Sequence, residues 1–111
     1  MKNLFLLGLF SLTFVSLRAQ KIYATQYAYQ ADVKVYVVQH KYQADLCVYK
    51  VPYEYQAQGN RGLWYFVKYE YQADKKIYFT DYEYQADLKI FFVDYQYQAG
   101  WQNKSKQYLM Y

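Results

Sequence analysis

Residue types that usually carry catalysis or covalent cross-links are nearly absent from this chain. It has one cysteine, Cys47, one histidine, His40, and a single serine after residue 20, Ser105. These counts exclude a disulfide framework, a zinc site made of cysteines and histidines, and a serine-based catalytic triad. We therefore expect no enzyme activity, with no catalytic residue, no cofactor-binding residue and no metal site.

Long apolar runs are also lacking. A membrane-spanning helix needs roughly 20 apolar residues, whereas the longest run here, residues 4–17, has fourteen. It follows a short positive segment and ends just before a small residue suited to cleavage, which is the pattern of a secretory signal peptide. We expect residues 1–20 to be removed, with a mature N-terminus between Gln20 and Tyr23, and residues 21–111 to form one extracytoplasmic domain, periplasmic or secreted. An uncleaved anchor or a buried first element is the alternative.

Neither sign of charge dominates the expected mature chain. Residues 21–111 contain eleven Lys or Arg residues and nine Asp or Glu residues, which leaves a net charge of +2. So small a basic excess gives no reason to expect a nucleic-acid partner. We expect a monomer without a membrane span, and the composition identifies no particular partner.

The sequence is dominated instead by one phrase, Tyr-x-Tyr-Gln-Ala-Asp, written six times between residues 27 and 100. Its second tyrosine recurs at steps of 13, 13, 16, 13 and 13 residues. The longer step marks an insertion at 58–62, which divides the array into three copies plus three, and a short tail, 101–111, follows. The repeat positions, with Gln58 and Gly100 in the aspartate slot once each, are Tyr29, Gln30, Asp32, Tyr42, Gln43, Asp45, Tyr55, Gln56, Tyr71, Gln72, Asp74, Tyr84, Gln85, Asp87, Tyr97, Gln98 and Gly100.

Two residues with reactive side chains take slots that other residue types fill elsewhere in the array. His40 stands where the other copies have their first tyrosine, and Cys47 stands where other copies have lysine or leucine. We interpret His40 as a packed or hydrogen-bonded ring and Cys47 as a structural residue, since no histidine lies near the thiol in sequence to activate it.

The segments between the phrases predict an all-β fold. Runs such as 33–38 and 88–93 are rich in β-branched and aromatic residues and partly alternate, as strands do. We expect more than a third of the residues from Lys21 onward in strands, and no helix longer than two turns. Because a strand has a period of two, an odd repeat of 13 residues needs a turn or bulge in each copy. Asp and Gly share turn chemistry, so we expect that turn at the aspartate slot.

Tyrosine is so abundant that it is expected to build the core. The chain has 18 tyrosines, and Val, Ile and Leu together number 15 after residue 20. Buried phenol hydroxyls need hydrogen-bond partners. We interpret the six repeated glutamines as a ladder that satisfies phenol or backbone groups. A calcium site made by the aspartate row is a less favoured alternative, because Gln58 and Gly100 share that slot.

Several segments together resemble the septoil-knot domain family of small bacterial proteins. They are YAYQADVKVYVV from Tyr27, its near copy YEYQADLKIFFV from Tyr82, the central GLWYFV from Gly62 and the closing YQAGW from Tyr97. The resemblance covers about Tyr23 to Trp101. It implies an all-β repeat domain whose backbone forms a seven-crossing torus knot, with a biochemical role that is not established. In such a domain we expect the tail after Trp101 to be a free end able to thread.

Three classes of function are compatible with these observations. The first is an exported structural module that resists unfolding and proteolysis. The second is a binding module that uses exposed tyrosines and Trp64 or Trp101 for glycans, peptides or cell-wall polymers. The third is an assembly subunit of stacked strands, which the charges in every repeat oppose. We favour the first class, with the binding module as the alternative.

Overall fold

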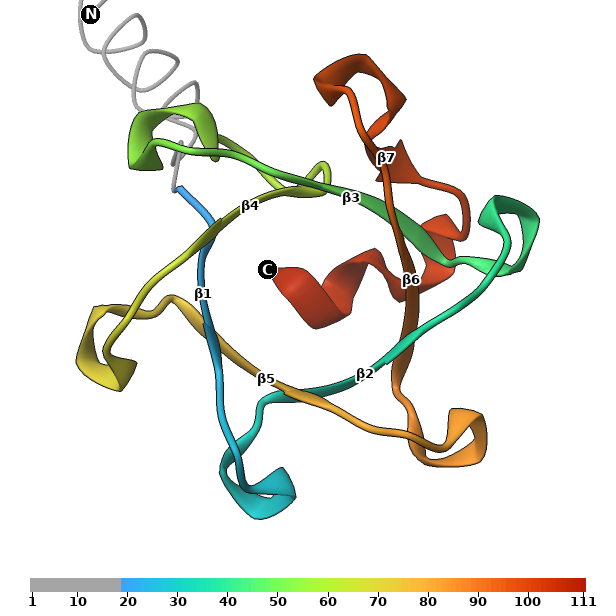
Figure 1. Cartoon of the computed structure of the whole chain (residues 1–111), viewed down its shortest axis with the longest axis horizontal. Helices are drawn as coiled ribbons and strands as arrows, with labels where there is room; N and C mark the ends of the chain where they lie inside the picture. The colour runs from blue at the N-terminus through green and yellow to red at the C-terminus, as the bar shows by residue number, and fades with distance from the viewer. Residues whose placement is uncertain (1–18) are drawn as a thin grey trace, which may run out of the picture.

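A computed structural model of the chain describes residues 19–111, and in it six short parallel strands close into a barrel (Figure 1). A further short strand, β7, pairs antiparallel with β3. The predicted signal peptide lies outside the described residues except for its last two positions. The strands are β1 (Lys21–Ala24), β2 (Val33–Val37), β3 (Leu46–Lys50), β4 (Leu63–Phe66), β5 (Lys75–Phe79), β6 (Leu88–Phe92) and β7 (Gly100–Trp101).

The two halves of the repeat array are interleaved around this barrel. The strand order is β4-β1-β5-β2-β6-β3, and β3 pairs again with β4 to close the ring. Strands of the first half therefore alternate with strands of the second half, and the chain makes two circuits (Figure 1). The insertion at 58–62 connects the circuits, and it is the one place where consecutive strands, β3 and β4, lie side by side.

Each copy of the phrase forms a three-residue 3-10 turn that projects outward (Figure 1). In each turn the backbone N–H of the glutamine donates to the carbonyl of the first aromatic residue at 3.0–3.1 Å. The turn therefore lies between the first aromatic residue and the glutamine of each copy. The prediction that placed it at the aspartate slot is wrong. The turns are η1 (Ala28–Gln30), η2 (Lys41–Gln43), η3 (Glu54–Gln56), η4 (Glu70–Gln72), η5 (Glu83–Gln85) and η6 (Gln96–Gln98).

Aliphatic residues, and not tyrosines, fill the barrel. One residue from each strand forms a middle layer in which every side chain is 0% exposed: Ile22, Val35, Val48, Trp64, Ile77 and Ile90. The predicted tyrosine core is thus wrong. Small barrels leave room only for closely packed side chains, and eight strands are already just wide enough for those. Six strands enclose less space, so compact β-branched chains fit where rings at every position would not.

The expected secondary-structure content is narrowly missed. The strands hold 30 of the 91 residues from Lys21 to Tyr111, just under a third. A seven-residue 3-10 helix, η7 (Lys104–Met110), slightly exceeds two turns at about three residues per turn. The strands are short because each copy of the repeat also contains a three-residue 3-10 turn that projects from the barrel. No helix among residues 19–111 is long and apolar enough to cross a membrane.

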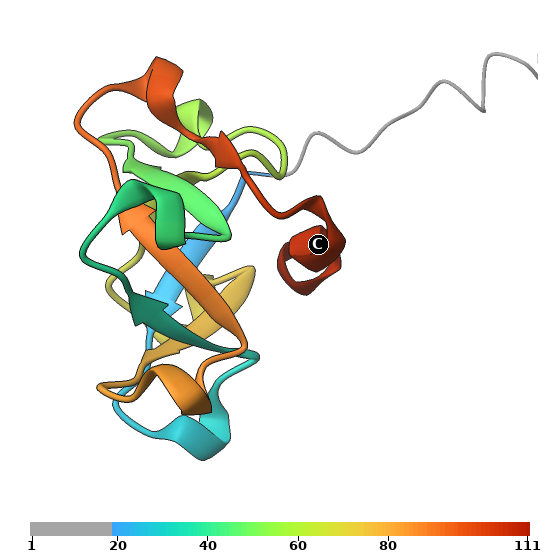
Figure 2. The same cartoon turned by 90° about the vertical axis from the view of Figure 1, so that its right-hand side faces the viewer.

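The tail after Trp101 is packed against the barrel, which corrects the expectation of a free end. Helix η7 lies beside one opening of the barrel (Figure 2), and Met110, 3% exposed, joins the core. The Gln20 amide donates to the Met110 carbonyl at 2.8 Å, and the Asn60 amide donates to the Gln107 carbonyl at 2.9 Å. The tail therefore covers the end of the barrel at which the parallel strands begin.

Candidate functional site

The six projecting turns carry the most distinctive surface of the molecule. We call each turn, together with its two aromatic residues, an aromatic petal. In every petal the two rings lie against each other with their centroids 5.7–5.9 Å apart, and in four petals the ring planes are within 16° of parallel. The pairs are Tyr27–Tyr29, His40–Tyr42, Tyr53–Tyr55, Tyr69–Tyr71, Tyr82–Tyr84 and Tyr95–Tyr97.

The petal rings are open to solvent. The second, outer ring of each petal is 69–83% exposed, and the first tyrosine ring is 51–60% exposed. The petals point away from the barrel in different directions (Figure 1), so no petal covers another. The sequence contained a signal for this exposure. The residue between the two aromatic rings is Lys, Glu or Gln in five of the six copies, and such residues are mostly exposed.

Three of the six repeated glutamines hydrogen-bond within or beside their own petals, and the six do not form a ladder. The side-chain oxygens of Gln30 and Gln85 accept from the hydroxyls of Thr25 and Thr80, at 3.2 and 3.0 Å. The Gln56 oxygen accepts from the Tyr53 N–H at 3.2 Å. Gln56 and Gln85 do satisfy a backbone N–H and a phenol, as predicted. The ladder arrangement is wrong, because the petals diverge and keep glutamines of different copies apart (Figure 1).

The repeated aspartates join neighbouring strands. Each donates its backbone N–H to the carbonyl of a lysine on the next strand, at 2.8 Å, and accepts that lysine's N–H with its carboxylate, at 2.9–3.2 Å. The two partners are 44 or 53 residues apart in the sequence. The expectation that each aspartate bonds its local backbone is therefore wrong. Among the described residues no three His, Cys, Asp or Glu side chains lie close enough together to hold a metal ion. The pairs are Asp32–Lys76, Asp45–Lys89, Asp74–Lys21 and Asp87–Lys34.

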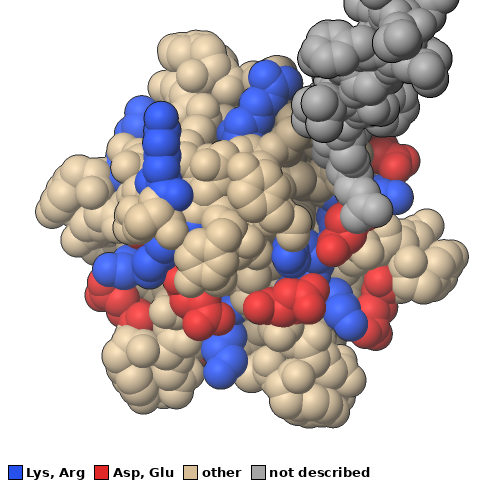
Figure 3. Space-filling view, turned by 180° about the vertical axis from the view of Figure 1, so that it is seen from behind, with Lys and Arg blue, Asp and Glu red and all other residues tan. Residues whose placement is uncertain are grey.

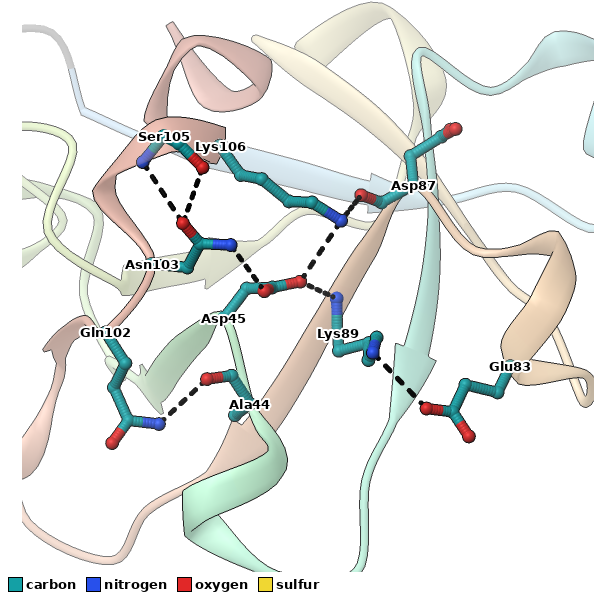
Figure 4. Close-up of polar contacts among 9 residues, drawn as sticks. All are labelled: Ala44, Asp45, Glu83, Asp87, Lys89, Gln102, Asn103, Ser105 and Lys106. Atoms are coloured by element: carbon teal, nitrogen blue, oxygen red, sulfur yellow. Dashed lines mark hydrogen bonds and ion pairs between the residues drawn. The ribbon is translucent and has the colours of Figure 1, made fainter.

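Asp45 additionally holds the tail, as Figure 4 shows. Its carboxylate accepts from the Asn103 amide at 3.2 Å and lies 3.6 Å from the Lys106 ammonium. Its carbonyl accepts the backbone N–H groups of Gln102 and Asn103, at 2.8 and 3.0 Å. The Gln102 amide donates to the Ala44 carbonyl at 2.9 Å. We call these contacts of Asp45 with residues 102–106 the tail latch.

We expect Asp45→Ala to destabilise the domain more than Asp32→Ala. Both substitutions remove a carboxylate that accepts a neighbouring strand's N–H at 2.9 Å. Only Asp45→Ala also leaves Asn103 and Lys106 without their carboxylate partner. The additional loss in the free energy of unfolding should be about 1–3 kcal/mol. Denaturant unfolding followed by tryptophan fluorescence measures it, and equal losses in the two variants would show that the latch contributes nothing.

The other singled-out residues take structural places. The His40 ring stacks on the Tyr42 ring, with the centroids 5.7 Å apart and an angle of 11° between the ring planes. His40 thus takes the place that the first tyrosine has in the other petals. Cys47 is 1% exposed, and burial raises the pKa of its thiol, which the nearby Lys41 only partly opposes. A buried thiol with a raised pKa is a poor nucleophile. Trp64 lies in the core, so its predicted use as an exposed binding residue is wrong.

Comparison with known proteins agrees with the interleaved winding. A family model described as the 7(1) septoil knot domain matches residues 19–102. The chain belongs to this family. The resemblance found in the sequence and the all-β knotted fold that it implies are thereby confirmed. The family match ends before η7, so most of the tail that covers the barrel of this septoil knot domain lies beyond the matched region. No curated protein and no solved structure matches the chain.

Proposed function

We propose that this septoil knot domain is an exported, non-enzymatic binding module whose barrel presents the aromatic petals to a polymeric ligand, such as a cell-wall glycan. The exposure of paired rings at six positions carries this proposal. Aromatic side chains normally dominate the energetics of cores and interfaces, and large exposed apolar surfaces mark interaction sites. Here the core is mostly aliphatic, with Trp64 as its buried aromatic ring, and the petal rings stand outside it, where stacking on the faces of sugar rings is possible.

The charges beside the petals favour a neutral ligand. Glu54, Glu70 and Glu83 stand between the two tyrosines of their petals, and each forms an ion pair with a lysine at 3.2–3.3 Å. Lysines and acidic residues lie interspersed on the face shown in Figure 3, while the lobes that project at its edge are largely uncharged. A polyanion would find no continuous basic surface there, whereas a neutral polysaccharide would meet uncharged rings.

Six petals on one scaffold make multivalent binding possible. A polymer with repeated sugars can contact several petals, and each contact after the first is intramolecular. Such linkage can raise the affinity about 10²–10⁴-fold without any new kind of contact. Weak stacking at each petal is therefore sufficient for retention on an insoluble polymer.

A pull-down on cell-wall polysaccharide tests the proposal. Replacing the six outer tyrosines with alanine should weaken retention about 100-fold or more, because both the stacking and the multivalency are lost. Replacing one outer tyrosine, for example Tyr71→Ala, should have a far smaller effect. Tyr108→Ala is the matched control, since Tyr108 is 68% exposed but lies in the tail. Retention that survives the sixfold replacement would refute the petals as the binding surface.

A structural module without a ligand is the second candidate, and the closed, knotted sheet favours it. Every strand of a closed barrel is paired on both edges, which removes the edges at which other chains add. This candidate expects high resistance to proteases together with no retention on any glycan or peptide. The pull-down therefore separates the two functions.

Export is part of both proposals and rests on the signal-peptide pattern of residues 1–20. Ile22 lies in the middle layer of the barrel, and Gln20 is 8% exposed and bonded to the tail. A mature chain that begins at Gln20 keeps these contacts, whereas one that begins at Tyr23 loses Ile22. We therefore propose cleavage at the residues just before β1. The intact mass of the exported protein would overturn this if Met1 were retained.

A further inference from the structure

The petal tyrosines also differ from the tyrosines of the barrel wall in their access to soluble reagents. The outer rings are 69–83% exposed. Among residues 19–111 the only petal hydroxyl with a protein partner belongs to Tyr84, to which the Gln85 amide donates at 3.4 Å. Five further tyrosines lie on the barrel wall and are only partly exposed: Tyr23, Tyr36, Tyr49, Tyr65 and Tyr78. The chain therefore has two tyrosine populations that a soluble oxidant would reach to different extents.

The geometry of a petal disfavours coupling within the pair. The ring centroids are 5.7–5.9 Å apart; in three of the five tyrosine pairs the ring planes are within 16° of parallel, and in the other two they are tilted by 37° and 39°. Phenoxyl radicals couple through the ring carbons next to the phenol oxygen, and these carbons lie on the ring edges. The petals project in different directions from a closed sheet (Figure 1), so outer rings of one chain do not meet while the barrel is intact. An outer ring of a second chain meets no such restriction.

We propose that the aromatic petals are sites of oxidative tyrosine cross-linking between copies of this chain, with a peroxidase and hydrogen peroxide as the oxidant. Each of two phenols loses one electron and one proton. The two phenoxyl radicals form one carbon–carbon bond between ortho positions, and the two ortho hydrogens move to the oxygens, which restores both phenols. The two electrons and two protons that were removed reduce one hydrogen peroxide to two water molecules.

The number of petals determines what such cross-linking produces. When only the outer ring of a petal couples, a chain with one reactive petal stops at dimers, and a chain with two forms linear polymers. A chain with six, as here, forms a branched network. The cross-linked product would keep folded barrels as its nodes, because the petals contribute no residue to the buried core.

The test treats the purified protein with a haem peroxidase and hydrogen peroxide. Dityrosine fluorescence and denaturing electrophoresis report the yield, and peptide mass spectrometry locates the links. One variant replaces all petal tyrosines with phenylalanine, which keeps the rings and removes the phenols. The control variant replaces the five wall tyrosines instead. Both variants also carry Tyr108→Phe and Tyr111→Phe, because these tail tyrosines are 68% and 78% exposed.

We expect the petal variant to lose about nine-tenths or more of the dityrosine, since the reacting phenols are gone. The control variant should keep its yield within about twofold, since the wall phenols that it lacks are poorly accessible. A variant that keeps only the Tyr42 petal, whose other ring is His40, has one petal phenol and should stop at dimers. Links that map to the wall or the tail and not to the petals in the unmodified protein would overturn the proposal, and so would an equal loss in the petal and control variants. The mapping does not depend on any variant folding.

Discussion

Unfolding of the septoil knot domain in strong denaturant is expected to take hours or longer, at the slow end of the range known for small domains. The chain makes two interleaved circuits, so each of β1, β2 and β3 lies between two strands of the second half. The barrel cannot open from an edge. The tail must first leave its latch on Asp45, and a chain end must then withdraw through the winding. A denaturant jump followed by tryptophan fluorescence measures the rate, because Trp64 is completely buried.

Refolding should show at least one slow phase, because a chain end has to thread through a loop that is already formed, in addition to the slow non-local pairing of strands. Disulfides cannot cause this phase in a chain with one cysteine. The only prolyl bond precedes Pro52, and Pro52→Ala removes it. Isomerisation takes roughly 10–100 s, so a slow phase that persists in Pro52→Ala belongs to threading. Unfolding and refolding that both finish within a second would refute kinetic protection.

Gly62→Ala should be among the most destabilising single substitutions, with a loss of about 3–5 kcal/mol in the free energy of unfolding. Gly62 has φ +83°, a conformation that L side chains rarely adopt. An added Cβ would also clash with the Cys47 carbonyl oxygen and come within 3.3 Å of the Gly100 backbone nitrogen. Three strands, β3, β4 and β7, meet at this point, so the backbone there has little freedom to shift.

Gly59→Ala is a matched control for this prediction. Gly59 belongs to the same insertion and has a similar φ of +76°, but no atom lies within 4 Å of the position that its Cβ would take. It should lose only about 1–2 kcal/mol, the cost of the left-handed conformation. The difference between the two alanine variants isolates the close approach of strands at Gly62. Equal losses in equilibrium unfolding would show that the clash is relieved without cost.

The sequence could predict the local parts of this structure. The six copies and their strands were readable, since β2 and β6 occupy 33–37 and 88–92 where runs at 33–38 and 88–93 were expected. Short strands and tight turns depend on the preferences of residues close together in the sequence. A 13-residue sequence repeat therefore predicts a repeat of one strand and one turn. The insertion at 58–62 was also readable, because it interrupts that period.

The placement of the tyrosines could not be read in the same way. A repeated tyrosine has the same period whether it points into a core or away from it. The abundance of rings suggested a tyrosine core, yet the narrow interior of this six-stranded barrel is filled mainly by Val, Ile and Leu, together with the single ring of Trp64. The petals are consequently on the outside, and they became candidates for binding only when the closed barrel was seen.

The sequence by itself determined that the chain is an all-β array of six copies, because strand and turn preferences act over a few residues. The tertiary structure alone decided three further features: the tyrosines stand outside the barrel, each aspartate bonds a lysine 44 or 53 residues away, and Asp45 holds the tail. Each of these depends on which strands become neighbours. That choice is made by closing two circuits of chain into one barrel, where segments remote in sequence share a single enclosed space of limited width.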